Sequence, residues 1–171
     1  MTVKLGFHPP ERLAAATVER ADPLLRWGCP GTDVANAVRA DRVWLQSDTK
    51  DWLFVAYQLR SATEARDAIA AIAAMARTCT ADAFTYTGHP APDIGDAAAL
   101  VSLVDKEGVV VDCFGQTERQ LMSRCRQDEL FFAIGDHVVQ AYLYGEWYPG
   151  SEAEYLDELI RIGEAAESAL R

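Results

Sequence analysis

Histidine, serine, cysteine and carboxylate side chains are the groups in this chain whose types could carry chemistry. The three histidines, His8, His89 and His137, lie far apart, and none has a second histidine at i+3 or i+4, so a metal site would depend wholly on tertiary contacts. The G-x-S-x-G nucleophile elbow and the glycine-rich phosphate-binding motifs are absent. The pattern therefore predicts a non-enzyme with no catalytic residue, no metal and no cofactor.

Acidic residues are abundant, with 26 aspartates and glutamates in 171 residues. Asp93, Asp96, Asp105, Glu107 and Glu118 have no spacing that separates a catalytic pair from the others. Carboxylates are mostly exposed in folded proteins. We therefore expect a solvated acidic surface rather than an acid–base pair.

Two aromatic residues, Trp147 and Tyr148, stand in a proline- and glycine-containing segment where no core position is expected. Exposed aromatic rings often anchor recognition because each buries a large area at a small entropic cost. Trp147 and Tyr148 are therefore candidate ligand-binding residues. The alternative is a hydrophobic clasp over the start of the last helix.

The four cysteines are even in number, and none belongs to a C-x-x-C pair. Four cysteines allow three disulfide connectivities, which spacing alone cannot separate. Their positions favour Cys113 with Cys125, which flank a poorly patterned segment between two expected strands, and Cys29 with Cys79. Disulfides would indicate an oxidising compartment. The alternative is four buried free thiols.

Length and composition indicate one globular domain over residues 1–171, since 50% of the residues are apolar and 25% are charged. The net charge of -10 and the pI near 4.7 disfavour nucleic acid as a partner, because its phosphates are bound mainly by lysine and arginine. No segment approaches the roughly 20 apolar residues of a membrane span. Residues 1–10 lack the features of a secretory signal, which taken alone favours the cytoplasm.

Strand-forming residues dominate the middle and the later part of the chain. Gly135-Asp136 predicts a two-residue hairpin turn, and Lys106-Glu107-Gly108 predicts a longer one. The expected strands are Arg42 to Gln46, Asp51 to Leu59, Phe84 to Thr87, Ala98 to Asp105, Val109 to Phe114, Leu130 to Ile134 and His137 to Tyr144.

Two capping boxes mark the main helices. Ser61-Ala-Thr-Glu64 precedes an alanine-rich amphipathic segment that ends near Cys79, and Ser151-Glu-Ala-Glu154 opens the last helix. Pro9 to Arg26 suggests a further helix interrupted at Pro23, and Thr32 or Asp33 could cap a short helix through Val38. The pattern predicts an α+β fold, with an antiparallel sheet of hairpin-connected strands packed against two main amphipathic helices.

Several of these features follow one another in a familiar order. Cys29 precedes an apolar strand around Trp44 and a strand that ends in Tyr57-Gln-Leu, and Ser-Ala-Thr-Glu-Ala65 opens a helix that closes at Cys79. Ile94-Gly-Asp96, the strand pair from Leu130 to Tyr144 and a helix ending in Ser-Ala-Leu170 complete the order. In this order the chain resembles the PknH-type extracellular sensor domain of actinobacteria, which occurs on Ser/Thr kinases and on lipoproteins.

The resemblance implies a non-catalytic, disulfide-bearing domain outside the cytoplasmic membrane, with a cleft for an unidentified small molecule or protein. Two other functions stay open from the residues. The first is a cytoplasmic acidic interaction protein, such as an immunity protein or a chaperone-like partner. The second is a hydrolase whose site is assembled entirely by tertiary contacts.

Overall fold

The computed structural model describes residues 15–27, 33–46, 51–80, 84–105, 126–144 and 152–170. These residues form strands and two helices. The elements are β1 (Ala15–Arg20), β2 (Leu24–Arg26), β3 (Asp33–Asn36), β4 (Arg39–Gln46), β5 (Asp51–Gln58), α1 (Ala62–Thr78), β6 (Phe84–Gly88), β7 (Ala97–Asp105), β8 (Arg126–Ile134), β9 (His137–Tyr144) and α2 (Glu152–Leu170).

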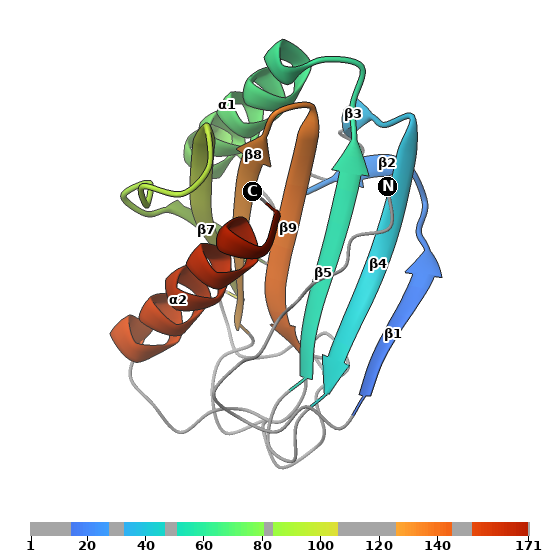
Figure 1. The fold of residues 1–171 in the computed structure, drawn as a ribbon. Helices are drawn as coiled ribbons and strands as arrows, with labels where there is room; N and C mark the ends of the chain where they lie inside the picture. Colours follow the sequence, from blue (N-terminus) through green and yellow to red (C-terminus); the bar gives the residue numbers. More distant parts are fainter. Residues whose placement is uncertain are drawn as a thin grey trace.

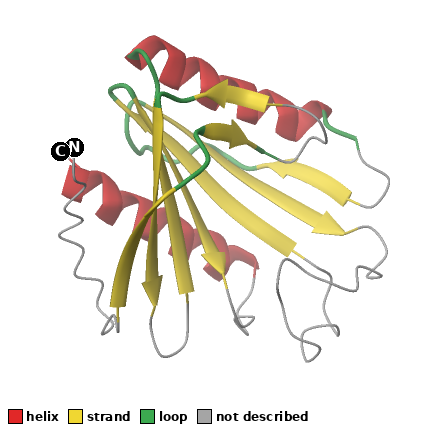
Figure 2. Cartoon of the chain, turned by 90° about the vertical axis from the view of Figure 1, so that its right-hand side faces the viewer, coloured by secondary structure: helices red, strands yellow, loops and turns green. Residues whose placement is uncertain are grey.

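Seven strands form one antiparallel sheet in the order β1-β4-β5-β9-β8-β7-β6, and β2 pairs with β3 in a separate antiparallel sheet. Helix α1 and the β2–β3 pair lie on one face of the large sheet, and α2 lies on the other (Figures 1 and 2). We call these the α1 face and the α2 face. The α+β fold expected from the sequence is confirmed.

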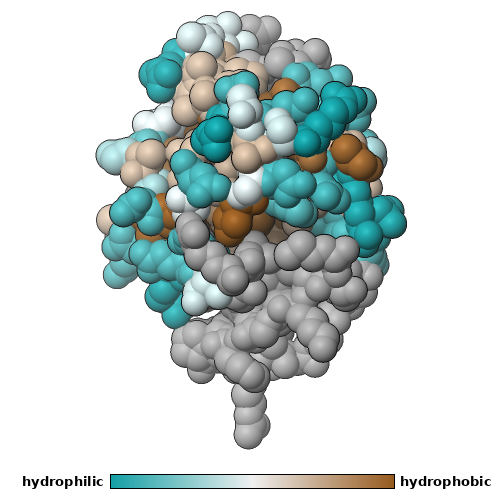
Figure 3. Space-filling model, turned by 45° about the horizontal axis from the view of Figure 1, so that its top comes forward, coloured by the Kyte–Doolittle hydropathy of each residue, from teal (hydrophilic) through white to brown (hydrophobic). Residues whose placement is uncertain are grey.

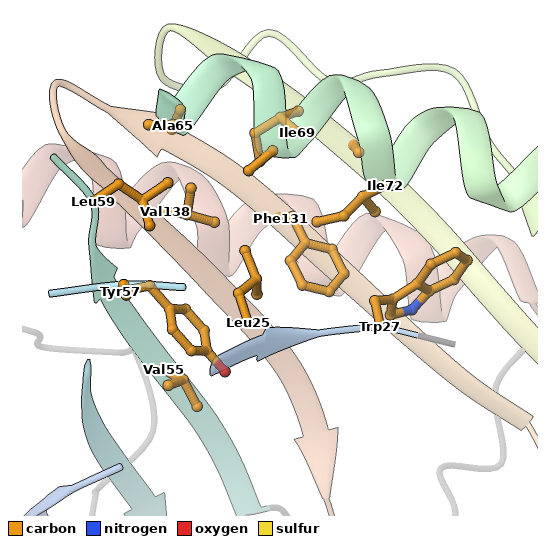
Figure 4. Close-up of a cluster of buried hydrophobic side chains, with 14 of the residues drawn as sticks. Leu25, Trp27, Val55, Tyr57, Leu59, Ala65, Ile69, Ile72, Phe131 and Val138 are labelled. Atoms are coloured by element: carbon orange, nitrogen blue, oxygen red, sulfur yellow. The ribbon is translucent and has the colours of Figure 1, made fainter. Parts of the chain in front are cut away.

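Strand β8 supplies both cores, because alternate residues of a strand point to opposite faces. Phe131 belongs to the core under α1, whereas Leu130 and Phe132 belong to the core under α2. In Figure 4 the Phe131 ring lies between Ile72 of α1 and the β2 segment that carries Leu25 and Trp27. A strand buried on both faces reads as a continuous apolar run, as Leu130 to Ile134 does.

Helix α1 begins at the predicted capping box. The Ser61 hydroxyl accepts a hydrogen bond from the Glu64 backbone N–H at 3.2 Å, and the Glu64 carboxylate accepts one from the backbone N–H of Arg60, also at 3.2 Å. Small side chains let the helix approach the sheet closely. The buried positions are Ala65, Ala68, Ile69, Ile72 and Ala76.

Helix α2 packs on β8 and β9, and its predicted cap residue Ser151 lies outside the described residues. Gly163 of this helix packs against Leu130 of β8 and against Ile94. A Cβ atom at that position would lie 2.3 Å from Leu130 Cδ2 and 3.0 Å from Ile94 Cδ1. A side chain at this position would displace the buried Leu130 and Ile94 side chains, so the glycine lets α2 pack closely on them.

The predicted two-residue turn between β8 and β9 is confirmed, with Ile134 paired to His137 and Gly135 at a φ of 55°. Asp136 ties this turn to the end of β5, since its carbonyl accepts a hydrogen bond from the Leu59 N–H at 2.8 Å. The turn thereby fixes the register of β8 and β9 beside β5.

The helices predicted in the N-terminal part are wrong. Residues Ala15–Arg20 form β1, which pairs with β4, and Asp33–Asn36 form β3, which pairs with β2. Pairing with a neighbouring strand overrode the helical preference of the alanines. The predicted strand from Val109 to Phe114 and the turn at Lys106 to Gly108 lie outside the described residues.

The molecular surface near α1 is mainly hydrophilic, with apolar atoms in small separate patches (Figure 3). Val38, at 67% exposure, is the large apolar side chain that stands exposed among the described residues. No helix in the described ranges is long and apolar enough to cross a membrane.

Candidate functional site

Polar side chains enter the sheet at the start of β8. The strand begins at Arg126 and not at the expected Leu130, so Gln127, Asp128 and Glu129 are part of the sheet. Asp128 is 2% exposed and Glu129 is 5% exposed. Such burial is rare for carboxylates unless they are hydrogen-bonded, so the partners of both residues define the candidate site.

On the α1 face, Glu129 is held by two amides. Gln127 donates from Nε2 to Glu129 Oε1 at 2.5 Å, and Gln140 of β9 donates from Nε2 to Glu129 Oε2 at 2.6 Å. Gln140 Oε1 in turn accepts a hydrogen bond from the Tyr57 hydroxyl of β5 at 3.1 Å. We call Tyr57, Gln140, Glu129 and Gln127 the Glu129 chain. It links three adjacent strands through side-chain hydrogen bonds.

Burial has the largest effect on the pKa values of Glu129 and Tyr57 in the Glu129 chain. Removal from water raises the pKa of Glu129 to about 7, and the nearby charge of Asp128 adds to the rise, while the two amide hydrogen bonds oppose it. Burial also raises the pKa of Tyr57 to about 12, with the Glu129 charge as the next contribution. Glu129 therefore changes its charge near neutral pH, whereas Tyr57 keeps its proton.

Arg42 of β4 lies on the same face, opposite Val55 of β5. Its positive charge lowers the pKa of Tyr57 in opposition to Glu129, which shows that Arg42 lies within electrostatic reach of the hydroxyl. Its Nε atom is buried and has no hydrogen-bond partner. A buried donor without an acceptor is uncommon in folded proteins.

Leu25 of strand β2 and Trp27, directly after the strand, add apolar and aromatic groups to the α1 face. Leu25 is fully buried next to Tyr57 and Phe131 (Figure 4). Trp27 makes edge-to-face contacts with Tyr86, at a centroid distance of 5.7 Å, and with Phe131, at 6.4 Å. The polar chain thus lies in apolar surroundings, which is the cause of its shifted pKa values.

A second set of hydrogen-bonded polar side chains, His89, Ser102 and Asp128, lies on the α2 face. His89 Nε2 lies 2.6 Å from Ser102 Oγ of β7, and the Ser102 hydroxyl donates a hydrogen bond to Asp128 of β8. Ser102 is 1% exposed. In a nucleophilic triad the histidine lies between serine and carboxylate and takes the serine proton. Here serine lies in the middle and its proton points at Asp128, so His89 donates to it.

The residues expected from the sequence fall mostly outside the described part of the chain. Trp147, Tyr148, Cys29, Cys113 and Cys125 all do, so their roles stay predictions. Cys79 is described, follows the last turn of α1 and is not a free thiol. His137 lies beside Asp136 in the β8–β9 turn, with Nδ1 at 2.7 Å from a carboxylate oxygen.

Asp128 and Glu129 were not expected as site residues, and the prediction that carboxylates are solvated is wrong for these two. The sequence does contain a signal for them. If the strand is extended backward with period two, Glu129 and Gln127 share a face with Phe131, and Asp128 shares a face with Leu130. Starting the strand at Leu130 left these polar residues in a loop.

Histidine, cysteine and carboxylate side chains do not gather in groups of three or more that could bind a metal within the residues described. No protein-family model matches the chain, and no curated protein matches it. The Glu129 chain with Arg42 is therefore the strongest candidate site on structural grounds alone.

We expect the free energy of unfolding to decrease as the pH rises from about 5 to about 8. The folded protein retains the Glu129 proton up to a pKa of about 7, whereas the unfolded chain loses it near 4.5. The contribution is fully present below the unfolded value and is lost as pH rises through the folded value. Its size is about 3 kcal/mol, at about 1.4 kcal/mol per pKa unit.

Denaturant unfolding at several pH values measures this decrease. Glu129→Gln should flatten the curve, because the neutral amide no longer has to lose a proton inside the sheet. Glu164→Gln is the matched control, since Glu164 is exposed on α2 and its loss removes the same charge. Equal slopes for wild type and Glu129→Gln would contradict the expectation.

Proposed function

We propose that this chain is a non-catalytic ligand-binding or sensor domain that acts outside the cytoplasm. The observation that carries the proposal is the Glu129 chain beside Arg42. Binding sites are typically apolar surfaces in which a few fixed polar groups set the orientation of the ligand. Tyr57, Gln140 and Glu129 are engaged with one another, so Arg42, on the same face, is the unsatisfied donor of this group.

The order of groups on the α2 face supports a non-catalytic role. Ser102 donates its only hydroxyl proton to Asp128, so His89 is not placed to accept that proton. Ser102 is also closed off from solvent, at 1% exposure. The arrangement instead joins β7, β8 and the segment after β6, which supports a structural role for His89.

The state of Cys79 supports the proposed location. A cysteine that is not a free thiol fits an oxidising compartment, because cytosolic thiols are kept reduced. We propose the pairs Cys29–Cys79 and Cys113–Cys125, in keeping with the resemblance to PknH-type sensor domains. Trp147 and Tyr148 stay proposed ligand contacts, since they follow directly after β9, the strand that carries Gln140.

We expect no turnover of ester, phosphoester, peptide or glycoside substrates, because the Ser102 hydroxyl proton is directed at Asp128 and Ser102 is closed off from solvent. Assays on substrate panels with wild type and Ser102→Ala measure this. Ser102→Ala should lower the stability without changing the background rates. Turnover that is abolished in a folded Ser102→Ala or Glu129→Gln variant would contradict the non-catalytic assignment.

Peptide mapping under non-reducing conditions tests the location and the disulfides together. We expect one linked peptide pair with Cys29 and Cys79 and another with Cys113 and Cys125. A peptide joining Cys79 to Cys113 or Cys125 would overturn the pairing alone. Four thiols that alkylate in the native protein would overturn the extracytoplasmic location and favour a cytoplasmic interaction protein.

A further inference from the structure

Among the arginines in the described ranges, Arg42 has a buried Nε atom without a hydrogen-bond partner. Five of them, Arg20, Arg26, Arg39, Arg60 and Arg161, each lie within ion-pair distance of a carboxylate. Arg42 has neither an ion pair nor a hydrogen bond there, although the chain carries 26 acidic residues and a net charge of -10. An unpaired arginine on the inner face of such an acidic protein calls for a physical explanation.

The missing partner has a defined chemistry. The Nε–H of Arg42 is buried and points to no acceptor, while the side chain as a whole is only partly buried. The planar guanidinium group offers two parallel N–H donors along its Nε edge, which match two oxygens of a carboxylate or a phosphate. A single water satisfies one donor, whereas an oxyanion satisfies both donors and the charge.

The direction of the Glu129 chain strengthens this assignment. Both Glu129 oxygens are occupied by amides, so the carboxylate is not free to pair with Arg42. The Tyr57 proton is directed at Gln140 and is likewise occupied. Asp22 is within ion-pair distance of Arg26, and Asp41 is within that distance of Arg39. Glu19, which stands opposite Arg42 in the register of β1 and β4, is exposed and forms no ion pair with Arg42.

We propose that Arg42 is the receptor for the anionic group, a carboxylate or a phosphate, of the ligand that binds this face of the sheet. The inference rests on the proposed ligand-binding function and names the chemical class of its ligand. The oxyanion accepts hydrogen bonds from Nε and from one terminal nitrogen of Arg42.

Titration of the full chain with sodium phosphate and with sodium acetate, followed by NMR of the arginine Nε–Hε groups, tests the proposal. We expect a saturable shift of the Arg42 resonance that sodium chloride at equal ionic strength does not reproduce. A response to phosphate alone identifies a phosphate receptor, and a response to acetate alone identifies a carboxylate receptor. A response equal to that of chloride, or none, overturns the proposal.

Arg42→Gln should abolish the saturable response of the neighbouring backbone amides of Val55 and Tyr57. Arg77→Gln, on the exposed last turn of α1, is the matched control and should retain it. If Arg42→Gln does not fold, Arg42→Lys keeps the charge without the two-donor edge, and we expect anion binding about tenfold weaker. Unchanged binding in either folded variant overturns the proposal.

A thermal-shift panel of anionic, neutral and cationic compounds separates this inference from the proposed function. Compounds that stabilise wild type and Arg42→Gln equally would remove the role of Arg42 and leave ligand binding intact. If no compound of any charge class binds saturably, the result counts against the ligand-binding function as well.

Discussion

The carboxyl group of Glu129 is taken out of water in the middle of a sheet, and the surrounding structure has to compensate for its desolvation. Two glutamine amides donate to it, from its own strand and from β9, and Tyr57 extends the network to β5. Leu25 and Trp27 of the β2 segment close the face above. Because these hydrogen bonds only partly offset burial, the pKa of Glu129 stays near 7. The protonation state of the Glu129 carboxyl group therefore sets the charge on this face. The same group is hydrogen-bonded to side chains of its own strand and of β9.

Two adjacent residues of β8 serve opposite faces of the sheet. Glu129 points to the α1 face, while Asp128 points to the α2 face and holds Ser102. The Asp128 charge contributes to the raised pKa of Glu129, so the two faces are electrically coupled through a single strand. Arg42 and Glu129 act in opposite directions on the pKa of Tyr57.

The sequence predicted correctly those features whose hydrogen bonds are formed between residues close together in the chain. The capping box at Ser61 and the turn at Gly135-Asp136 satisfy backbone groups within a few residues, and both are confirmed. The N-terminal strand β1 was taken for a helix, since its partner β4 lies further along the chain and pairing decides its conformation. The site was missed for a similar reason. Glu129 was placed in a loop because the strand was started at Leu130, and its partners Gln140 and Tyr57 reach it only through strand pairing across the sheet.

The pKa of Glu129 in the folded protein tests the central claim most directly. NMR of the side-chain carboxyl carbon, assigned by comparison with Glu129→Gln, gives this value in a pH titration. The account predicts a midpoint near pH 7 for Glu129, well above the ordinary glutamate value of 4.5. A midpoint at or below 4.5 would show that the carboxyl group is solvated or ion-paired, and would contradict the buried chain on which the proposed site depends.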